Sequence, residues 1–400
     1  MRLRGKSFIM DFFDSLKEYE GMKPGLSRIK KFLKDAGDPQ DKIKCIHIAG
    51  TNGKGSAAAF LAAALEENGY KTALYTSPHL IDITERIQIN GKNISKTDFT
   101  ALSKKYIHLA KKYKLSYFEY LTALAFVYFA VQKVGAAVIE TGLGGRFDAT
   151  NIIKKPLACV ITSIGLDHKE ILGNSVSKIA FEKAGIIKKN CPVICGDLPK
   201  SALKAVEKKA KPLVLGKDFR VKKIKLSLLG KHQQKNAAVA FETLKILRKH
   251  GFKLDDNKIK SAFKNAKWPA RLDIRKLPNK AKLLIDGAHN EQAVKAFVSF
   301  LKSYLKGKKA VFIFAAMKEK EYKKVLTQIL PFAKKIFLPN ISSKRAEKPE
   351  ILEKEILKIS KKIKTVKNIC VKEVLKHLAR DEKNISVGSL YLAGEILKTI

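Results

Sequence analysis

The sequence predicts an α/β protein with a P-loop-containing, doubly wound, mostly parallel sheet, followed by a smaller Rossmann-like α/β domain. Short β-branched runs alternate with helical segments along the chain, as in βαβ units. Most of these runs lead into a polar or glycine-rich turn, which is typical of the carboxyl ends of parallel strands. A glycine-rich loop between the apolar run 43–49 and the helical segment 57–65 opens the pattern.

The loop Gly50-Thr51-Asn52-Gly53-Lys54-Gly55-Ser56 predicts a phosphate-binding site. Freed backbone N–H groups and the positive end of the next helix can hold a polyphosphate, while Lys54 reaches the terminal phosphates and Ser56 faces Mg²⁺. The match to the general P-loop pattern is incomplete, because its first glycine falls at Ile48 and Lys54 is followed by Gly55. A glycine-rich turn with a solvated lysine is the alternative, and the strand before and helix after argue against it.

The following segments continue the alternation. We expect strands at 71–76, 136–140 and 158–163, a hairpin around Asn90-Gly91, and helices at 97–113 and 118–133. The second helix is apolar on nearly all sides and should be buried. A further helix lies within 228–250, the pattern breaks between Trp268 and Pro278, and new strands follow at 282–286, 310–315, 335–338 and 385–387.

Length and composition predict a cytoplasmic protein of two domains. We place the boundary near Pro278, which gives an ATP-binding domain at 1–278 and a smaller domain at 279–400. No stretch approaches the ~18 to 20 continuous apolar residues of a membrane span, so we expect no membrane contact. The five cysteines are odd in number and scattered, which favours buried, reduced thiols. We expect a monomer.

The net charge of +43 raises nucleic acid as a partner. Lysine dominates the basic residues, however, and it is spread through every helix rather than gathered on one face or tail. The alternative is a lysine-rich chain whose helix surfaces are simply solvated. We favour this alternative and expect no specific nucleic-acid site. A positive field would still attract anionic substrates.

Polar residues at the expected strand ends indicate where chemistry could occur. Glu140 ends an expected strand, and Ser77, His79 and His168 follow expected strands. These four residues could converge on the Gly50 loop, because open α/β sheets bind ligands along that edge. A carboxylate such as Glu140 commonly holds magnesium against a P-loop nucleotide. Each residue also has a simpler explanation: a tight turn at Glu140 and a hydrogen-bonded loop histidine at His168.

Two later positions have equally simple alternatives. Lys183 lies near a helix C-terminus, where a lysine ordinarily complements the helix dipole. The run Asp286-Gly287-Ala288-His289-Asn290 can be a turn in which Asn290 caps the next helix.

Eight ordered motifs resemble the folylpolyglutamate synthase and dihydrofolate synthase family, which belongs to the Mur ligases. They are the Gly50 loop, Ser77-Pro78-His79-Leu80, and the segments 140–151, 162–168, 182–186, 232–236, 268–271 and 286–290. The resemblance covers nearly the whole chain and is far more specific than the P-loop alone. The main departure is Ala270, where the family usually has glycine.

The resemblance implies a nucleotide and metal site at the Gly50 loop. Lys54 and the loop amides would hold the ATP phosphates, Ser77 and Glu140 one Mg²⁺, and His168 with Glu140 a second. Lys183 matches a lysine that family members carry as a carbamate. A carbamate is a carboxylate, which suits a magnesium-rich pocket better than an ammonium does.

The resemblance also assigns residues further along the chain. Asn236, Arg271 and Asp286 match positions that contact ATP, the last two from the domain junction and the C-terminal domain. His289 would lie near the incoming glutamate or the phosphoryl group. Phe118, Glu119 and Arg146 fall where the family contacts the pteridine and substrate.

The implied reaction is ATP-dependent ligation of L-glutamate to dihydropteroate, to a reduced folate, or to both. ATP would phosphorylate a substrate carboxylate, and the glutamate amine would attack the mixed anhydride. No enzyme nucleophile is needed. Two alternatives remain open. One is a Mur-type ligase for another carboxylate substrate, although only some forty residues precede the loop. The other is a basic nucleic-acid-binding ATPase.

Overall fold

The computed structural model describes residues 8–16, 25–221 and 224–400, which form two compact units. The first unit comprises the described residues up to His79, then Ile83–Lys225 and Lys235–Ala266. The second comprises Leu80–Asp82, Leu226–Gln234 and Lys267–Ile400. The chain therefore changes unit at Lys267 rather than near Pro278. The reason is that β9 (Asp273–Lys276) pairs with β10 (Lys282–Ile285), so the strand before Pro278 belongs to the second sheet.

The first unit contains an eight-stranded, mostly parallel sheet with strand order β4-β3-β2-β5-β1-β6-β7-β8. Its strands are β1 (Cys45–Ala49), β2 (Thr72–Tyr75), β3 (Ile87–Ile89), β4 (Lys92–Asn93), β5 (Ala136–Glu140), β6 (Ala158–Ile161), β7 (Val193–Cys195) and β8 (Leu213–Val214). Among the described strands of this sheet, β3 runs against its two neighbours: it pairs antiparallel with β2 and, in the predicted hairpin, with β4. The order places β1 between β5 and β6, so the loops that follow these three neighbouring parallel strands meet at one edge.

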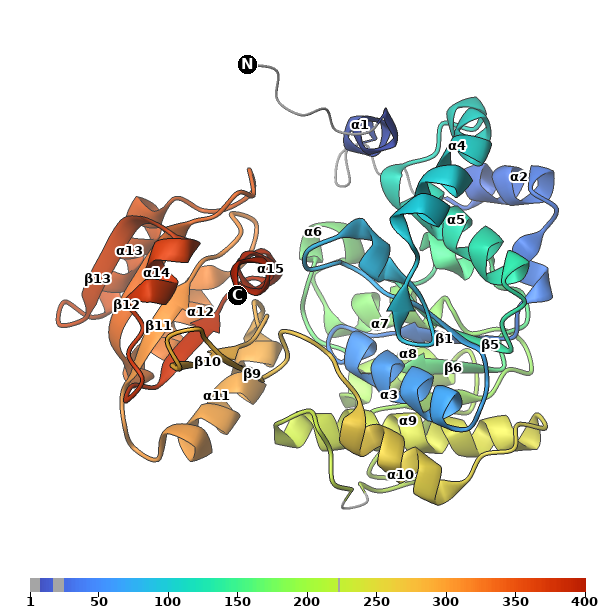
Figure 1. Ribbon diagram of the computed structural model, residues 1–400. Coiled ribbons are helices and arrows are strands. Elements are labelled where there is room, and N and C mark those ends of the chain that lie inside the picture. The colour runs from blue at the N-terminus through green and yellow to red at the C-terminus, as the bar shows by residue number, and fades with distance from the viewer. Residues whose placement is uncertain (1–7, 17–24, 222–223) are drawn as a thin grey trace. The chain divides into compact units, whose positions relative to one another are not determined.

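Helices cover both faces of this sheet (Figure 1). They are α1 (Phe8–Ser15), α2 (Ser27–Asp35), α3 (Lys54–Glu67), α4 (Lys96–Lys112), α5 (Tyr117–Val131), α6 (Lys169–Leu172), α7 (Val176–Ala184), α8 (Lys200–Glu207), α9 (Lys231–Lys249) and α10 (Asp256–Asn265), with 3₁₀ turns at Pro39–Lys42, Ile83–Arg86 and Ala149–Ile152. The start of α9, up to Gln234, belongs to the second unit. α5 begins at a capping box in which Ser116 and Glu119 satisfy each other's backbone N–H groups. Its apolar surface is buried against the sheet, α2 and α4, as its composition predicts.

The second unit contains a six-stranded sheet with order β13-β12-β11-β14-β10-β9, parallel except for β9. Its remaining elements are α11 (Glu291–Leu305), β11 (Ala310–Phe314), α12 (Tyr322–Ile329), the 3₁₀ turn Leu330–Phe332, β12 (Ala333–Asn340), α13 (Pro349–Ile359), β13 (Lys364–Cys370), α14 (Val371–Lys376), β14 (Asn384–Val387) and α15 (Leu390–Thr399). One apolar core packs α11, α12 and α13 against the sheet, and a second packs α14 and α15 against its other face. The Rossmann-like prediction is confirmed.

Some strands lie where the sequence pattern is weak. β13 is an edge strand within a lysine-rich run, and its side chains are mostly exposed or half-buried, so no alternating apolar pattern marks it. Charged edge strands of this kind discourage pairing with other chains. β7 and β8 are too short to show a period.

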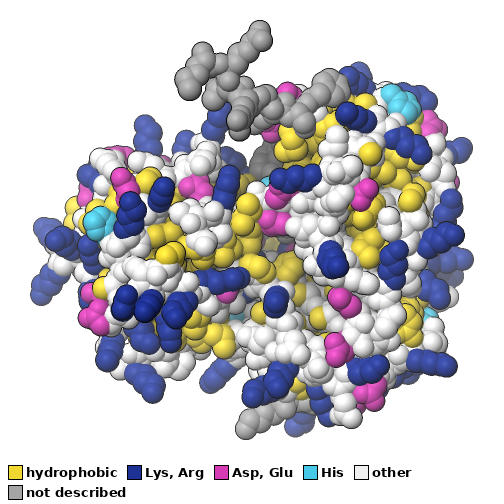
Figure 2. Space-filling view, in the orientation of Figure 1, with side chains coloured by type: hydrophobic (Ala, Val, Ile, Leu, Met, Phe, Trp, Pro, Cys, Tyr) yellow, Lys and Arg dark blue, Asp and Glu magenta, His cyan; other side chains and the backbone are white. Residues whose placement is uncertain are grey.

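The basic residues are dispersed. Figure 2 shows Lys and Arg side chains over the visible face of each unit, with Asp and Glu side chains among them. This distribution agrees with the prediction of solvated helix surfaces. Within the described residues, no helix is long and apolar enough to cross a membrane.

Candidate functional site

The site in the first unit is built on the loop between β1 and α3. Gly53 has φ +85° and precedes the first residue of α3, so the helix begins at Lys54 with its free N–H groups facing the loop. A Cβ atom at Gly53 would lie 2.4 Å from Oδ1 of Asn236, which is closer than a side chain permits. A residue other than glycine would therefore be strained and would fill the space between the loop and Asn236.

Side chains that follow β6 hold this loop in place. The Thr51 N–H donates to the Ser163 carbonyl at 2.7 Å, and the Asn52 N–H donates to Ser163 Oγ at 3.0 Å. Thr162 Oγ1 donates to the Asn52 carbonyl at 2.8 Å. Thr51 Oγ1 exchanges two hydrogen bonds with the backbone of Gly165, at 3.0 and 3.1 Å. The loop is thus pre-organised, and the Thr51 side chain is used to brace it.

Sequence reasoning missed Thr162 and Ser163 as site residues. The available signal was their position at the end of β6, which is the strand next to β1.

Lys54 and Glu140 face each other at the strand ends. Lys54 Nζ donates to the Gly50 carbonyl at 3.2 Å and lies 3.8 Å from Oε1 of Glu140. Glu140 ends β5 and is 4% exposed, and its Oε2 accepts a bond from the Ser77 N–H at 3.4 Å. The structure therefore brings Lys54, Glu140 and Ser77 together at the sheet edge, as predicted.

Lys183 is also brought to the loop. Its side chain is 5% exposed, and its Nζ donates to the Gly50 carbonyl at 2.8 Å. Burial, with the positive charge of Lys54, lowers the pKa of Lys183 to about 7. The interpretation of Lys183 as a solvated cation at a helix end is therefore wrong, although Lys183 does lie in the last turn of α7.

Two glycines allow Lys183 to reach this position. A Cβ at Gly145 would lie 2.7 Å from the Lys183 carbonyl, and one at Gly185 would lie 2.4 Å from the Arg146 backbone. The loop after β5 and the end of α7 thus touch through their backbones. Asn151 secures the contact, because its Nδ2 donates to the carbonyls of Arg146 and Gly185.

We expect Lys183 to make stability depend on pH. Its pKa is about 7 in the folded state and near its ordinary 10.5 in the unfolded chain, so the unfolded state binds more protons between these values. The free energy of unfolding should therefore rise with pH across this window, and this gain is lost again as pH falls from 10.5 to 7. Between pH 7 and pH 10.5 the free energy of unfolding of the wild type should rise by at most about 5 kcal/mol relative to that of Lys183→Met.

The measurement is urea unfolding of both proteins at several pH values in bicarbonate-free buffer. A difference that stays constant across pH would contradict the low pKa of Lys183.

His168 lies further along the same edge. It has φ +49° and precedes the short helix α6, with its ring nitrogens 3.9 Å from Asp167 Oδ1 and 3.8 Å from Glu170 Oε1. Its side chain is 38% exposed. Within the described residues no group of three His, Cys, Asp or Glu side chains forms a ready-made metal site. The role of His168 as a ligand stays a prediction.

Other predicted contacts have visible structural partners. Ser56 is 2% exposed in the first turns of α3. Glu119 pairs with Arg28 at 3.1 Å and completes the cap of α5. The side chain of Arg146 is half-exposed and pairs with Glu182 at 2.7 Å. The Phe118 ring fills the space that a Cβ at Gly142 would need. The metal contact of Ser56 and the substrate contacts of Phe118, Glu119 and Arg146 stay predictions.

A buried polar chain supports the loop after β5. Asp148 accepts hydrogen bonds from the N–H groups of Gly142 and Leu143 through one oxygen and from Thr150 through the other. Thr150 Oγ1 in turn contacts His47 Nε2 at 2.8 Å inside β1. Burial lowers the pKa of His47 to about 3, so this histidine is neutral. Sequence reasoning did not assign these three residues to the site.

Arg271, Asp286 and His289 lie together in the second unit. Asp286 is buried, and its two oxygens accept bonds from the N–H groups of Leu272 and Ala288 at 2.8 and 2.9 Å. Burial raises the pKa of Asp286, and the nearby Arg271 opposes this effect. His289 Nδ1 contacts the Gly287 carbonyl at 2.8 Å. Asn290 caps α11, as the simpler interpretation of this run predicts.

Ala270 adopts a conformation that favours glycine. Its φ is +58°, and its carbonyl accepts bonds from the Gly287 N–H at 3.0 Å and from the Arg271 side chain at 2.9 Å. The backbone at this position thus has the conformation that favours glycine, although Ala270 is strained in it.

We expect Ala270→Gly to raise the free energy of unfolding by up to about 1 kcal/mol, because glycine adopts positive φ without strain. Chemical denaturation of the full chain measures this change. The matched control is Ala266→Gly, at φ −56°, which should instead destabilise. Destabilisation by both variants would contradict the strain at Ala270.

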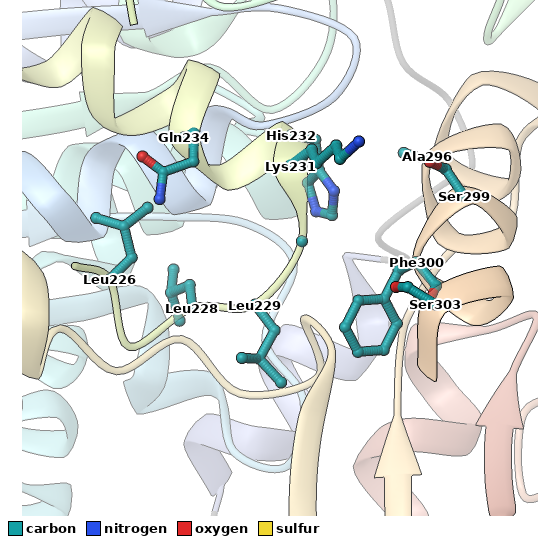
Figure 3. A pocket seen from close by; sticks show the side chains of 11 residues that line it. Leu226, Leu228, Leu229, Lys231, His232, Gln234, Ala296, Ser299, Phe300 and Ser303 are labelled. Atoms are coloured by element: carbon teal, nitrogen blue, oxygen red, sulfur yellow. The ribbon is translucent and has the colours of Figure 1, made fainter. Parts of the chain in front are cut away.

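A separate cavity of about 430 Å³ lies in the second unit between the segment 226–234 and one side of α11. Figure 3 shows His232, at the start of α9, and Phe300, on α11, on opposite sides of it. Burial and the charge of Arg271 lower the pKa of His232 to about 4. No residue that we predict to contact nucleotide or metal lines this cavity.

Family comparisons agree with the geometry of both units. The family model described as "Mur ligase middle domain" matches residues 48–218, which contain the P-loop sheet. The model described as "Dihydrofolate synthetase, C-terminal domain" matches residues 270–399. A relative named dihydrofolate synthase/folylpolyglutamate synthase, from Bacillus subtilis, is 34% identical over 95% of this chain and 96% of its own length. The chain belongs to the folylpolyglutamate synthase and dihydrofolate synthase family.

Two further relatives support this membership. A probable dihydrofolate synthetase of Schizosaccharomyces pombe is 34% identical and covers 94% of this chain and 97% of its own. The solved Mycobacterium tuberculosis folylpolyglutamate synthase complexed with ADP has a TM-score of 0.88 at 27% identity, covering 98% and 97% of the two chains. The fold predicted from sequence is therefore that of the Mur ligases, and the chain is a ligase.

Proposed function

We propose that this ligase adds L-glutamate to dihydropteroate, to a reduced folate, or to both, and forms ADP and phosphate through an acyl-phosphate intermediate. The observation that carries the proposal is the braced P-loop with Lys54, Glu140 and Lys183 at one sheet edge, in a chain of this family. The Bacillus subtilis relative bears both activity names, and the Mycobacterium tuberculosis relative was solved with ADP. Family membership favours this function over a different carboxylate substrate or a nucleic-acid-dependent ATPase.

In the proposed mechanism the loop holds the ATP phosphates. The N–H groups at the start of α3 point into the loop, and Lys54 supplies a positive charge to the β- and γ-phosphates. The substrate carboxylate attacks the γ-phosphorus, and the glutamate amine then displaces phosphate from the acyl phosphate. The enzyme positions the reactants and neutralises charge, and no side chain forms a covalent bond.

The residues at the strand ends fit Mg²⁺. Glu140 offers a buried carboxylate beside the loop, and oxygen donors are what Mg²⁺ prefers. Ser77 with Glu140 would hold one ion and Glu140 with His168 a second, and Ser56 is a further candidate ligand. When bound, Mg²⁺ neutralises charge on the transferring phosphoryl group.

Lys183 suits conversion to a carbamate. Only a neutral amine adds carbon dioxide, and a pKa of about 7 leaves a large neutral fraction at physiological pH. The resulting carboxylate would lie at the loop, where it can replace an ammonium that repels bound cations.

The remaining predicted contacts complete the proposal. Asn236, next to Gly53, would contact the nucleotide from the first unit, and Arg271 and Asp286 from the second after closure. His289 would lie near the glutamate or the phosphoryl group. Phe118, Glu119 and Arg146 would contact the pteridine and the rest of the substrate.

The test is an ATP- and glutamate-dependent assay with dihydropteroate and tetrahydrofolate side by side. Product is measured by mass, as the addition of one glutamate residue, together with ADP. Turnover with either acceptor supports the proposal and identifies the acceptor. ADP formation without a glutamylated product, or no turnover with both, would overturn it. The monomeric state and the cytoplasmic location stay predictions.

A further inference from the structure

Two cysteines that are far apart in sequence lie next to each other in the first unit. Sγ of Cys159, in β6, is 3.5 Å from Sγ of Cys191, which lies just before β7. The two strands pair in parallel, and the Cys159 N–H donates to the Pro192 carbonyl at 2.9 Å, so the sheet itself holds the thiols together. Their 32-residue separation hid this pair from sequence analysis.

The two thiols differ in environment. Cys159 is buried and donates its S–H to the Ile186 carbonyl at 3.3 Å, whereas Cys191 is partly exposed. The pKa of Cys191 is lowered by its hydrogen bond with Cys159 and by the charge of Lys188, and the pKa of Cys159 is raised. Burial raises the pKa of Cys45 and Cys195 to about 12, which leaves those thiols inert.

We propose that Cys159 and Cys191 form a peroxide-oxidisable thiol pair whose disulfide slows ligation; this effect on rate rests on the proposed function. The accessible, more acidic Cys191 reacts first. Its thiolate attacks hydrogen peroxide, the O–O bond breaks, and Cys191 becomes a sulfenic acid while the released hydroxide takes up a proton. The Cys159 sulfur then displaces the hydroxyl group, which leaves as water with the Cys159 proton. Two thiols and one peroxide give one disulfide and two waters.

The pair is connected to the site through the end of α7. Oxidation removes the S–H bond from Cys159 to Ile186, three residues after Lys183. Lys188, beside the pair, donates to Asn151 Oδ1 at 2.7 Å, and Asn151 holds the Gly185 carbonyl. Drawing the sulfurs to bonding distance therefore pulls on the backbone that places Lys183 at the P-loop.

The experiment uses the full chain with Cys370→Ser, which removes an exposed thiol and keeps a hydroxyl for the cap of α14. Protein is titrated with hydrogen peroxide, free thiols are alkylated, and peptides are mapped by mass spectrometry without reduction. Initial ligation rates are measured before and after treatment with dithiothreitol. Cys191→Ser in the same background is the matched variant.

We expect a Cys159–Cys191 cross-linked peptide and a rate loss of about tenfold or more, both reversed by dithiothreitol and absent in Cys191→Ser. Oxidation of Cys191 to a sulfinic acid without the cross-link would overturn the thiol pair. A cross-link that leaves the rate unchanged would overturn the regulatory role. Reduced protein without ligase activity would refute the proposed function instead, while the cross-link would still decide the thiol pair.

Discussion

Lys54→Ala should lower ligation by at least about 10²- to 10³-fold while the fold stays intact. The Lys54 ammonium lies at the start of α3, 3.2 Å from the Gly50 carbonyl and 3.8 Å from Glu140, where it can reach the terminal phosphates. Its removal deletes a positive charge on the transferring group, and saturating ATP cannot replace that charge in the transition state. The loss should therefore appear mainly in kcat.

The control for this prediction is Lys71→Ala, which removes an exposed lysine at the opposite end of the same sheet. It should leave kcat unchanged. Circular dichroism and denaturation of both variants establish that each is folded. Retained turnover in folded Lys54→Ala would sink the assignment of this loop to phosphate.

Local sequence patterns predicted the frame of the site well. The strand before Gly50, the helix after Lys54, and the strand that ends at Glu140 all lie where periodicity placed them. Parallel strands then bring their carboxyl ends to one edge, so the convergence of Ser77 and Glu140 follows from the fold class.

Contacts between distant segments could not be predicted in this way. A lysine in the last turn of a helix has the same local pattern whether it is solvated or buried, and Lys183 is buried because Gly145 and Gly185 let two backbones touch. The braces from Thr162 and Ser163 depend likewise on which strand lies beside β1. Strand order is a property of the whole sheet, and no short window of sequence contains it.

The domain boundary predicted near Pro278 shows the same limit of local sequence patterns. Proline and the break after Trp268 mark a change in the chain, yet β9 pairs antiparallel with β10 and so joins the second sheet. A short strand with exposed charged side chains, as at Asp273–Lys276, carries no periodic signal of its own.

Lys183→Ala should also abolish most ligation, with a loss of about 10²-fold or more. A dipole interaction at a solvated helix end would be worth only a few tenths to ~1 kcal/mol and would barely affect the rate. Lys183 instead donates to Gly50 at 2.8 Å inside the site, where a carbamate would supply negative charge to bound cations. The matched control is Lys178→Ala, an exposed lysine on the same helix, which should keep wild-type kinetics.

Chemical rescue separates a carbamate from a merely structural amine. Acetate can occupy the space that Lys183→Ala opens and restore a carboxylate there, so added acetate should raise the rate of this variant in a saturable manner. Methylammonium should not, whereas the reverse pattern would show that the amine itself is needed. Lys183→Met retains most of the buried stem and leaves no such space, so it should stay inactive in acetate. Wild-type turnover in folded Lys183→Ala would remove Lys183 from the mechanism and leave Glu140, Ser77 and His168 as the candidate ligands.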